Sequence, residues 1–308
     1  MIFLCGIPSE PSLGLVIDQL RVLDAPYVVF NQRRFAGTAM EFTVRGGQVD
    51  GWMQLEGRQY RLADFRAVYT RLMDHRRLPE VEREPPGSAL RLYCQALHTT
   101  MTRWYEIAPA RVLNRYEEIG SNYSKPYQAQ LLLEQGFAVP ETLITNQPDL
   151  VREFQRKHGQ VIYKSISAVR SIVQTLRDED LARLNAIRVC PVQFQEFVDG
   201  TNMRVHTVGS SHVFAVTIRS GATDYRYAHL QGEQEQLEAT EIDDTLAERC
   251  LRLAQALGLE FAGIDLKIRP DGTAYCLEVN ACPAFSYYEL HTGQPIARAV
   301  AGYLAAAV

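Results

Sequence analysis

The sequence lacks the features that mark secreted or membrane proteins. Its six cysteines are widely spaced over 308 residues, with no C-x-x-C pair, and its N-terminal residues lack the basic start and the length of a signal peptide. No uninterrupted apolar run reaches 18 residues, so no membrane span is expected. These absences predict a cytoplasmic protein with reduced thiols.

Excess positive charge is absent too. The formal net charge is −4 and the pI is ≈ 6.0, so nucleic acid is not expected to be the main partner. We find no internal repeat, no low-complexity segment, and no Ser-His-Asp or Cys-His arrangement of the kind that forms a covalent enzyme intermediate. The chain is 46% hydrophobic, which is enough for a large core, and we expect two or three subdomains.

The first 70 residues alternate between strand and helix patterns. Met1–Cys5, Pro26–Asn31 and Ala67–Thr70 are typical of strands, and Ser12–Leu23 has the apolar spacing of a helix. This alternation predicts a small open α/β sheet. The charged residues 71–77 follow the last of these strands, at the end where ligands bind in open α/β sheets, although a solvated loop fits equally well.

The segment 261–280 reads as a β-hairpin with three oxygen-bearing side chains on one face. If Asp271–Gly272 is a two-residue turn, Asp265 lies opposite Glu278, and Asn280 returns to the same face. Opposed carboxylates repel, so a cation should lie between them, and Mg²⁺ prefers such ligands. A solvated acidic face is the alternative, and a bulge at the turn would separate the pair.

Two lysines precede this hairpin at positions that suit an anion. Lys125 stands at the start of a helix predicted over Ser124–Gln135, where backbone N–H groups already favour negative charge. Lys164 lies in the apolar strand Val161–Ser165, and buried lysines are rare unless they are paired. The hydroxyl-rich loop 165–171 lacks the glycines of a P-loop, and it suits either phosphate contacts or simple exposure.

The order and spacing of these segments resemble the ATP-grasp superfamily. Within it, the sequence is most similar to the RimK-like branch, which includes a glutamate ligase that acts on a ribosomal protein and the graspetide, microviridin-type peptide ligases. The likeness covers most of residues 110–308 and rests on SNYSKPYQAQLLLEQGFAVPETL at 121–143, VIYKSISAVRS at 161–171, PVQFQEFVDGTNMRVHTVG at 191–209, and GIDLKI with YCLEVNACPAF at 263–285.

The resemblance implies an α/β fold of the α+β ATP-grasp type that grips ATP between two β-rich subdomains. We expect an N-terminal pre-ATP-grasp α/β domain at 1–109, a central subdomain at 110–190, and a C-terminal subdomain with the magnesium site at 191–308. The implied magnesium ligands are Asp265, Glu278 and Asn280. The implied nucleotide-binding residues are Lys125, Lys164, Ser165, Ser167, the hinge strand Gln195, Glu196, Phe197 and Val198, and Arg204.

Three arginines are expected to act on the phosphoryl group and the acid. By resemblance, Arg204 contacts the γ-phosphate and the reacting carboxyl group. Crowded cations are costly unless an anion joins them, so we expect Arg219 and Arg226 to hold a substrate carboxylate by two-point contacts. A surface pair between Arg226 and Asp224 is the alternative.

The activity implied by the resemblance is ATP-dependent ligation of a carboxylate to an amine or a hydroxyl. An acylphosphate forms, ADP and phosphate are released, and the product is an amide or an ester. The expected substrate is a peptide or amino-acid carboxylate, such as a precursor peptide or a protein tail. A small-molecule kinase and a nucleotide-binding regulatory protein without turnover are the alternatives. The sequence leaves open whether the protein is a homodimer.

Overall fold

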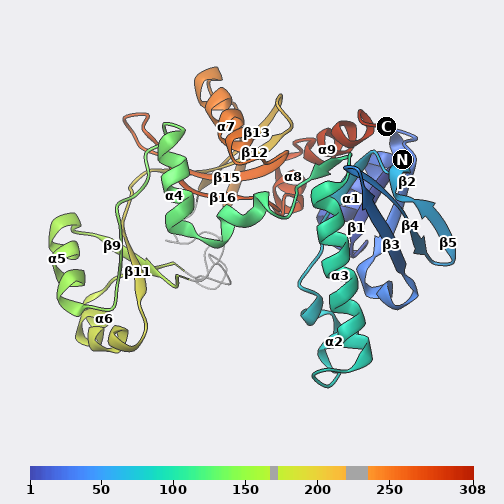
Figure 1. Cartoon of the computed structure of the whole chain (residues 1–308). Coiled ribbons are helices and arrows are strands. Elements are labelled where there is room, and N and C mark those ends of the chain that lie inside the picture. The colour runs from blue at the N-terminus through green and yellow to red at the C-terminus, as the bar shows by residue number, and fades with distance from the viewer. Residues whose placement is uncertain (167–172, 220–234) are drawn as a thin grey trace.

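A computed structural model describes residues 1–166, 173–219 and 235–308, and these form four β-sheets with flanking helices. Two predicted site residues, Ser167 and Arg226, lie outside the described residues, as does Asp224. The large C-terminal sheet lies between the central subdomain at one end and the N-terminal domain at the other (Figure 1). No described helix is long and apolar enough to cross a membrane.

The N-terminal domain contains the predicted open α/β sheet, and all its neighbouring strands are parallel. Its strand order is β2 (Tyr27–Asn31), β1 (Ile2–Gly6), β6 (Ala67–Thr70) and β7 (Arg111–Leu113). Successive β1 residues are buried on opposite faces: Ile2 and Leu4 pack with α1 (Pro11–Val22), whereas Phe3 and Cys5 pack with α3 (Ala89–Ile107). The domain extends past the expected boundary at 109, because β7 completes the sheet.

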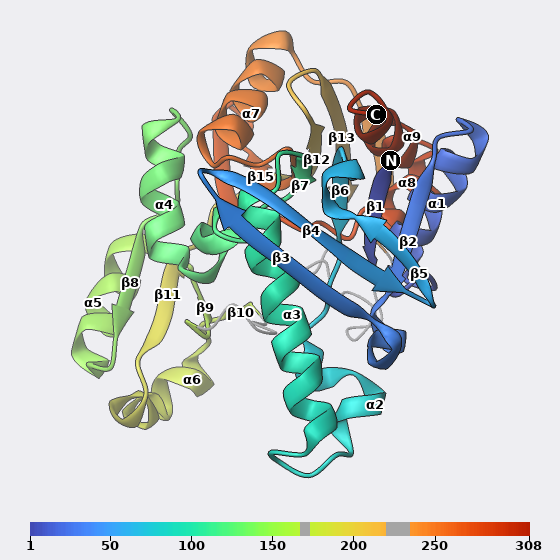
Figure 2. The ribbon, with the colours of Figure 1, turned by 45° about the vertical axis from the view of Figure 1, so that its right-hand side comes forward.

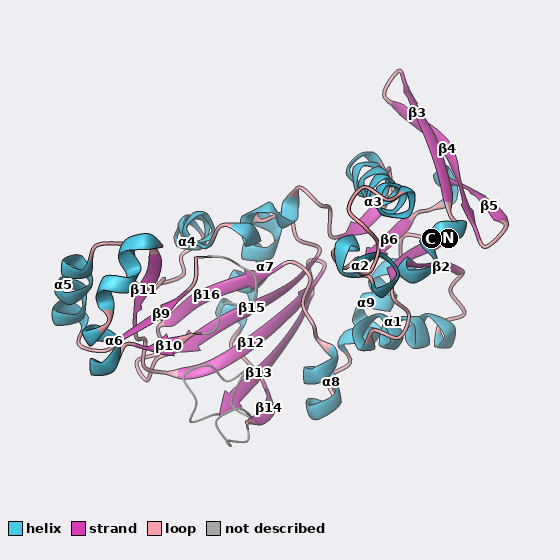
Figure 3. Ribbon diagram, turned by 90° about the horizontal axis from the view of Figure 1, so that it is seen from below, coloured by secondary structure: helices cyan, strands magenta, loops and turns pink. Residues whose placement is uncertain are grey.

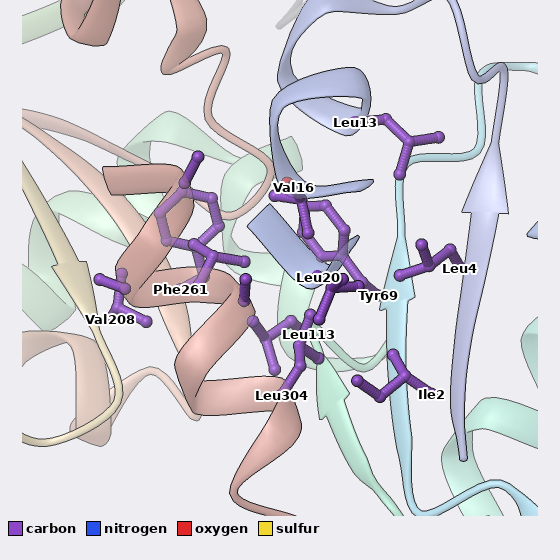
Figure 4. Packing of buried hydrophobic residues seen from close by; sticks show 14 of the residues in the cluster. Ile2, Leu4, Leu13, Val16, Leu20, Tyr69, Leu113, Val208, Phe261 and Leu304 are labelled. Atoms are coloured by element: carbon purple, nitrogen blue, oxygen red, sulfur yellow. The ribbon is translucent and has the colours of Figure 1, made fainter. Parts of the chain in front are cut away.

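The C-terminal helix returns to this N-terminal sheet. Helix α9 (Ile296–Ala305) packs beside α1, and its Leu304 belongs to the same hydrophobic core as Ile2, Leu20 and Tyr69 (Figure 4). A small antiparallel sheet extends alongside α3 (Figure 2), formed by β3 (Ala39–Arg45), β4 (Gln48–Leu55) and β5 (Arg58–Arg61), with the short helix α2 (Pro79–Glu82) below.

The central subdomain is a four-stranded sheet whose strand order differs from its chain order. It comprises β10 (Gln174–Thr175), β9 (Val161–Lys164), β11 (Val192–Glu196) and β8 (Thr142–Thr145), with helices α5 (Pro148–His158) and α6 (Asp178–Ala182). Strand β11 pairs antiparallel with both β8 and β9, so it belongs here although the expected boundary lay at 190.

The C-terminal sheet has five antiparallel strands, which lie side by side in Figure 3. They are β14 (Gln236–Thr240), β13 (His212–Arg219), β12 (Thr201–Val208), β15 (Phe261–Ile268) and β16 (Ala274–Asn280). Helices α4 (Lys125–Glu134) and α7 (Asp244–Ala256) pack on the face that carries Val205 and Ile264. Helix α8 (Ser286–Thr292) covers part of the opposite face, where Tyr288 packs on Val216.

The turn of the β15–β16 hairpin is longer than predicted, but the predicted pairing of Asp265 with Glu278 is present. Ile268, not Arg269, is the last paired residue before the turn and lies opposite Ala274, so the loop is longer than two residues. A β-bulge at Leu277 then shifts the register back, and Asp265 faces Glu278 as predicted. The bulge lets Cys276 enter the core while Glu278 faces the other way.

Candidate active site

One row of side chains crosses three neighbouring strands of the C-terminal sheet. Arg204 on β12 lies opposite Asp265 on β15, and Asp265 lies opposite Glu278 on β16. Arg204 Nη1 is 2.8 Å from Asp265 Oδ1, and their side chains are only 5% and 18% exposed. Two carboxylates therefore share a sheltered place with one guanidinium, which offsets part of their mutual repulsion.

The next row on the same face leaves room for that guanidinium. His206, Gly263 and Asn280 lie opposite one another on the same three strands. A Cβ on Gly263 would lie 2.1 Å from Arg204 Nη2, so only glycine fits there without moving the arginine. Asn280 lies beside Glu278 on the face of the carboxylates, as the sequence predicts.

Buried neighbours hold Arg204 in this orientation. Arg204 Nε donates to His206 Nε2 at 3.4 Å, and the Arg204 Cζ lies 5.7 Å from the centroid of the Tyr288 ring. Burial first, and the nearby guanidinium second, lower the pKa of His206 well below its usual value. A neutral imidazole can accept the hydrogen bond, so His206 supports Arg204 without adding charge.

The donor set fits a magnesium ion that binds together with a nucleotide. The described residues contain no group of three or more His, Cys, Asp and Glu side chains that could hold a metal on its own. Two carboxylates and one amide oxygen are all hard oxygen donors, and Mg²⁺ is commonly completed by substrate phosphates and water. Asp265, Glu278 and Asn280 would hold it here.

A cleft extends from this row to the end of strand β11. Three predicted groups line it: Lys125 and Lys164, the stretch Gln195 to Val198 at the end of β11, and the carboxylates Asp265 and Glu278. Lys164 is 9% exposed, and its Nζ lies 3.4 Å from Gln195 Oε1. Ser165 follows Lys164 directly and is exposed, and it is not among the residues that line the cleft. The cleft thus offers cations beside the two carboxylates.

Lys267 is a cleft residue that the motif analysis missed. It lies two residues after Asp265, its Nζ lies 4.9 Å from the Phe197 ring centroid, and it lines the cleft. Burial lowers the pKa of Lys267, and Asp199 opposes that shift. The scarcity of lysine could have drawn attention to Lys267, because the chain has only four lysines and three of them line this cleft.

Gln128 fixes helix α4 against strand β16. Its Nε2 donates to the carbonyl of Val279 and its Oε1 accepts from the Val279 N–H, both at 2.9 Å. The side chain is buried, so this two-point contact is shielded from water. Gln128 therefore positions Lys125, at the start of α4, relative to Glu278. A single glutamine in a helix gives no sequence signal for such a role.

Glu196 differs from expectation in the direction of its carboxylate. Its Oε1 accepts from the Glu141 N–H at 2.9 Å, and its Oε2 lies 3.3 Å from His158 Nδ1. These contacts lie on the face of the sheet opposite Lys164 and Gln195, because side chains alternate along the strand. The Glu196 carboxylate therefore points away from the side of the sheet that carries Lys164.

Arg219 does not join Arg204, contrary to the sequence-based prediction. Val216 is the β13 residue opposite Arg204, so Arg219, three positions further along, points to the other face. There its Nη2 lies 3.4 Å from Glu238 Oε2, and the Arg219 side chain is 69% exposed. Proximity in sequence misled the prediction because an odd spacing changes the face of a strand.

Sequence comparison identifies the family of this chain. Residues 123–304 match the model of the RimK-like ATP-grasp domain. A probable alpha-L-glutamate ligase of Xanthomonas euvesicatoria is 29% identical over 67% of this chain and 72% of its own length. One of Xanthomonas oryzae is 31% identical over 57% of this chain and 62% of its own length.

Solved structures resemble the whole chain. The ATP-grasp ligase PsnB, complexed with minimal precursor, Mg and ADP, has a TM-score of 0.79 and 29% identity, over 99% of this chain and 96% of that one. The macrocyclase MdnC of Microcystis aeruginosa, bound with precursor peptide MdnA, shares the fold with a TM-score of 0.78 at 23% identity, over 99% of each chain. Fold and site thus define an ATP-dependent ligase of the ATP-grasp class. The chain belongs to the RimK-like ATP-grasp family.

Proposed function

We propose that this ligase activates a peptide carboxylate with Mg²⁺-ATP and joins it to an amine or a hydroxyl. The observation that carries the proposal is the row Arg204, Asp265 and Glu278 at the end of a lysine-lined cleft. A carboxylate is a poor electrophile in water, so amide or ester formation requires prior activation. A site that places cations around a γ-phosphate is suited to that step.

The cleft suggests how the nucleotide binds. Adenine would dock against the backbone of Glu196 to Val198, and the phosphates would extend past Lys164 toward Asp265 and Glu278. Lys125, Lys164 and Arg204 would then offset the phosphate charge. Bound through Asp265, Glu278 and Asn280, Mg²⁺ would neutralise charge on the phosphate oxygens and orient them.

The chemistry proceeds in two transfers. A carboxylate oxygen attacks the γ-phosphorus, the bond to the β,γ-bridging oxygen breaks, and ADP leaves. The nucleophile, an amine or a hydroxyl, then attacks the acyl carbon, loses its proton, and expels inorganic phosphate. Arg204 is buried and already oriented, so it can stabilise the transferring phosphoryl group with little reorganisation.

A peptide is the proposed source of the carboxylate, and its side chain would be Asp or Glu. The support is that the structures of PsnB and MdnC, which match nearly the full length of this chain, were solved with bound precursor peptides. Arg226 remains a proposed carboxylate ligand, whereas the position of Arg219 favours a surface role. We also propose a cytoplasmic location, consistent with six free cysteines, and leave a homodimer as a hypothesis.

Hydroxylamine trapping tests the proposal. The protein is incubated with Mg²⁺-ATP, hydroxylamine and a panel of Asp- or Glu-containing peptides and free glutamate. An acylphosphate yields a hydroxamate together with ADP, whereas a kinase would yield a phosphorylated hydroxyl and no hydroxamate. Nucleotide binding without any ADP formation across the panel would favour the regulatory alternative.

A further inference from the structure

Arg71 connects the N-terminal domain to the segment that follows the metal-binding strand. It stands just after β6, and its side chain is 9% exposed. On one side, its Nε and Nη2 donate to the Glu10 carboxylate at 2.8 and 3.1 Å. On the other, its Nη1 donates to the Pro283 carbonyl at 3.0 Å and lies 3.5 Å from Cys282 Sγ.

The N-terminal side of this contact is itself fixed. Glu10 caps helix α1, because its Oε2 also accepts from the Leu13 N–H at 2.7 Å. A carboxylate that bonds both a helix terminus and a guanidinium has little freedom to move. Arg71 therefore extends from a rigid part of the N-terminal domain.

The other side lies next to the candidate active site. Pro283 is three residues after Asn280. A Cβ on Gly263 would lie 2.7 Å from the Pro283 Cβ and 2.1 Å from Arg204 Nη2. Pro283 and the Arg204 guanidinium thus border the same small space. A shift of Pro283 would change both the path of the chain beyond Asn280 and the room around Arg204.

We propose that Arg71 is a positioning residue through which the N-terminal domain sets the geometry of the metal and phosphate site. It holds the segment Asn280–Phe285 by the Pro283 carbonyl and thereby orients the Asn280 amide. The metal part of this proposal rests on the proposed function. Groups that orient metal ligands typically change metal affinity about 10- to 100-fold when removed.

The test compares Arg71→Ala and Arg71→Lys with Arg111→Ala. Arg111 also joins this domain to the C-terminal region, because its Nη1 donates to the Tyr303 carbonyl and its Cζ lies 4.1 Å from the Tyr303 ring centroid. It is therefore a control for the loss of a contact between domains. The readouts are the melting temperature and the binding of a fluorescent ADP analogue as a function of Mg²⁺ concentration.

Arg71→Ala should raise the half-saturating Mg²⁺ concentration about 10-fold or more, with unchanged binding of the analogue in EDTA. Arg71→Lys should lie between it and the wild type, because an ammonium keeps the charge but not the fork of donors. Arg111→Ala should stay within about twofold of the wild type, whatever its melting temperature.

Two results would overturn the proposal: wild-type Mg²⁺ dependence in folded Arg71→Ala, or an equal shift in Arg111→Ala. If Arg71→Ala does not fold, Arg71→Lys decides by the same criterion. A wild-type protein whose nucleotide binding ignores Mg²⁺ would instead contradict the proposed function.

Discussion

Arg204 and Asp265 face each other across β12 and β15, with Nη1 2.8 Å from Oδ1, and Glu278 stands next in the same row. The pair is nearly buried, so removing either partner would deprive the other of this ion pair in a place that water reaches poorly. Asp265 therefore has two neighbours of opposite kind: a guanidinium already in place, and a second carboxylate that requires a cation. In the proposed mechanism this arrangement would bring phosphate binding and metal binding together.

Glu278→Gln should abolish turnover while the protein remains folded. The substitution keeps the shape of the side chain but removes one of two negative ligands, and the expected loss of rate is about 10²-fold or more. Steady-state ADP release and circular dichroism measure the two effects. Glu248→Gln is the control, because Glu248 is an exposed helix residue that pairs with Arg252. Full activity in folded Glu278→Gln would refute the metal assignment.

Gly263→Ala should lower kcat about 10²-fold or more while ATP affinity changes little, because the new Cβ would displace the Arg204 guanidinium. Gly302→Ala is the matched control, since a Cβ there meets no atom within 4 Å. Single-turnover kinetics and nucleotide titration separate the two effects. Wild-type kcat in Gly263→Ala would show that the position of Arg204 does not matter to the chemistry.

Lys267→Met should raise the KM for ATP about 10-fold, because a cation at the nucleotide cleft is lost while its apolar stem is retained. The control is Lys157→Met, which removes the one lysine that does not line the cleft and pairs with Glu141 at 2.6 Å. An unchanged KM for ATP in Lys267→Met would exclude this lysine from nucleotide binding.

The stability of the protein should fall as the pH drops below about 6.5, in part because of His206. Its folded-state pKa is lowered, so the unfolded chain binds the proton first. The penalty begins at the unfolded pKa and grows toward lower pH by up to about 1.4 kcal/mol per pH unit.

His206→Gln removes this titration. Inside the protein His206 contacts Arg204 and the Tyr288 ring. The nearest row of side chains on the same face contains the carboxylates Asp265 and Glu278. His75 and His98 also have lowered pKa values, so the informative quantity is the difference between wild type and variant. Chemical denaturation at pH 5 and pH 7 measures the unfolding free energies from which this difference is calculated. Between pH 7 and pH 5, His206→Gln should lose less unfolding free energy than the wild type. Equal losses would show that His206 does not contribute to the pH dependence.

The sequence predicted the main elements because their periodicity is local. The predicted strand Ala67–Thr70 matches the structure at both ends, and the helix predicted over Ser12–Leu23 is displaced from α1 by one residue. The pairing of Asp265 with Glu278 was predicted from a two-residue turn that the structure does not have. A longer turn shifts the register by one residue, and the bulge at Leu277 shifts it back. Bulges depend on packing of both faces, here Cys276 in the core, which no local pattern shows.

The parts that could not be predicted depend on contacts distant in sequence. β7 and α9 both pack in the N-terminal domain although they lie far apart in the chain, so no local pattern shows where that domain ends. Gln128 and Arg71 gain their roles only from the carbonyls they meet, at Val279 and Pro283. Their residue types alone are compatible with an ordinary surface.

The most direct test of the central claim follows oxygen from the substrate carboxylate. An Asp- or Glu-containing peptide that the protein modifies is labelled with ¹⁸O in its side-chain carboxyl group and turned over with unlabelled Mg²⁺-ATP. Activation through an acylphosphate predicts that each turnover transfers one carboxylate oxygen to inorganic phosphate, which mass spectrometry detects. Phosphate free of ¹⁸O, with all label retained in the product, would show that ATP does not phosphorylate the carboxylate.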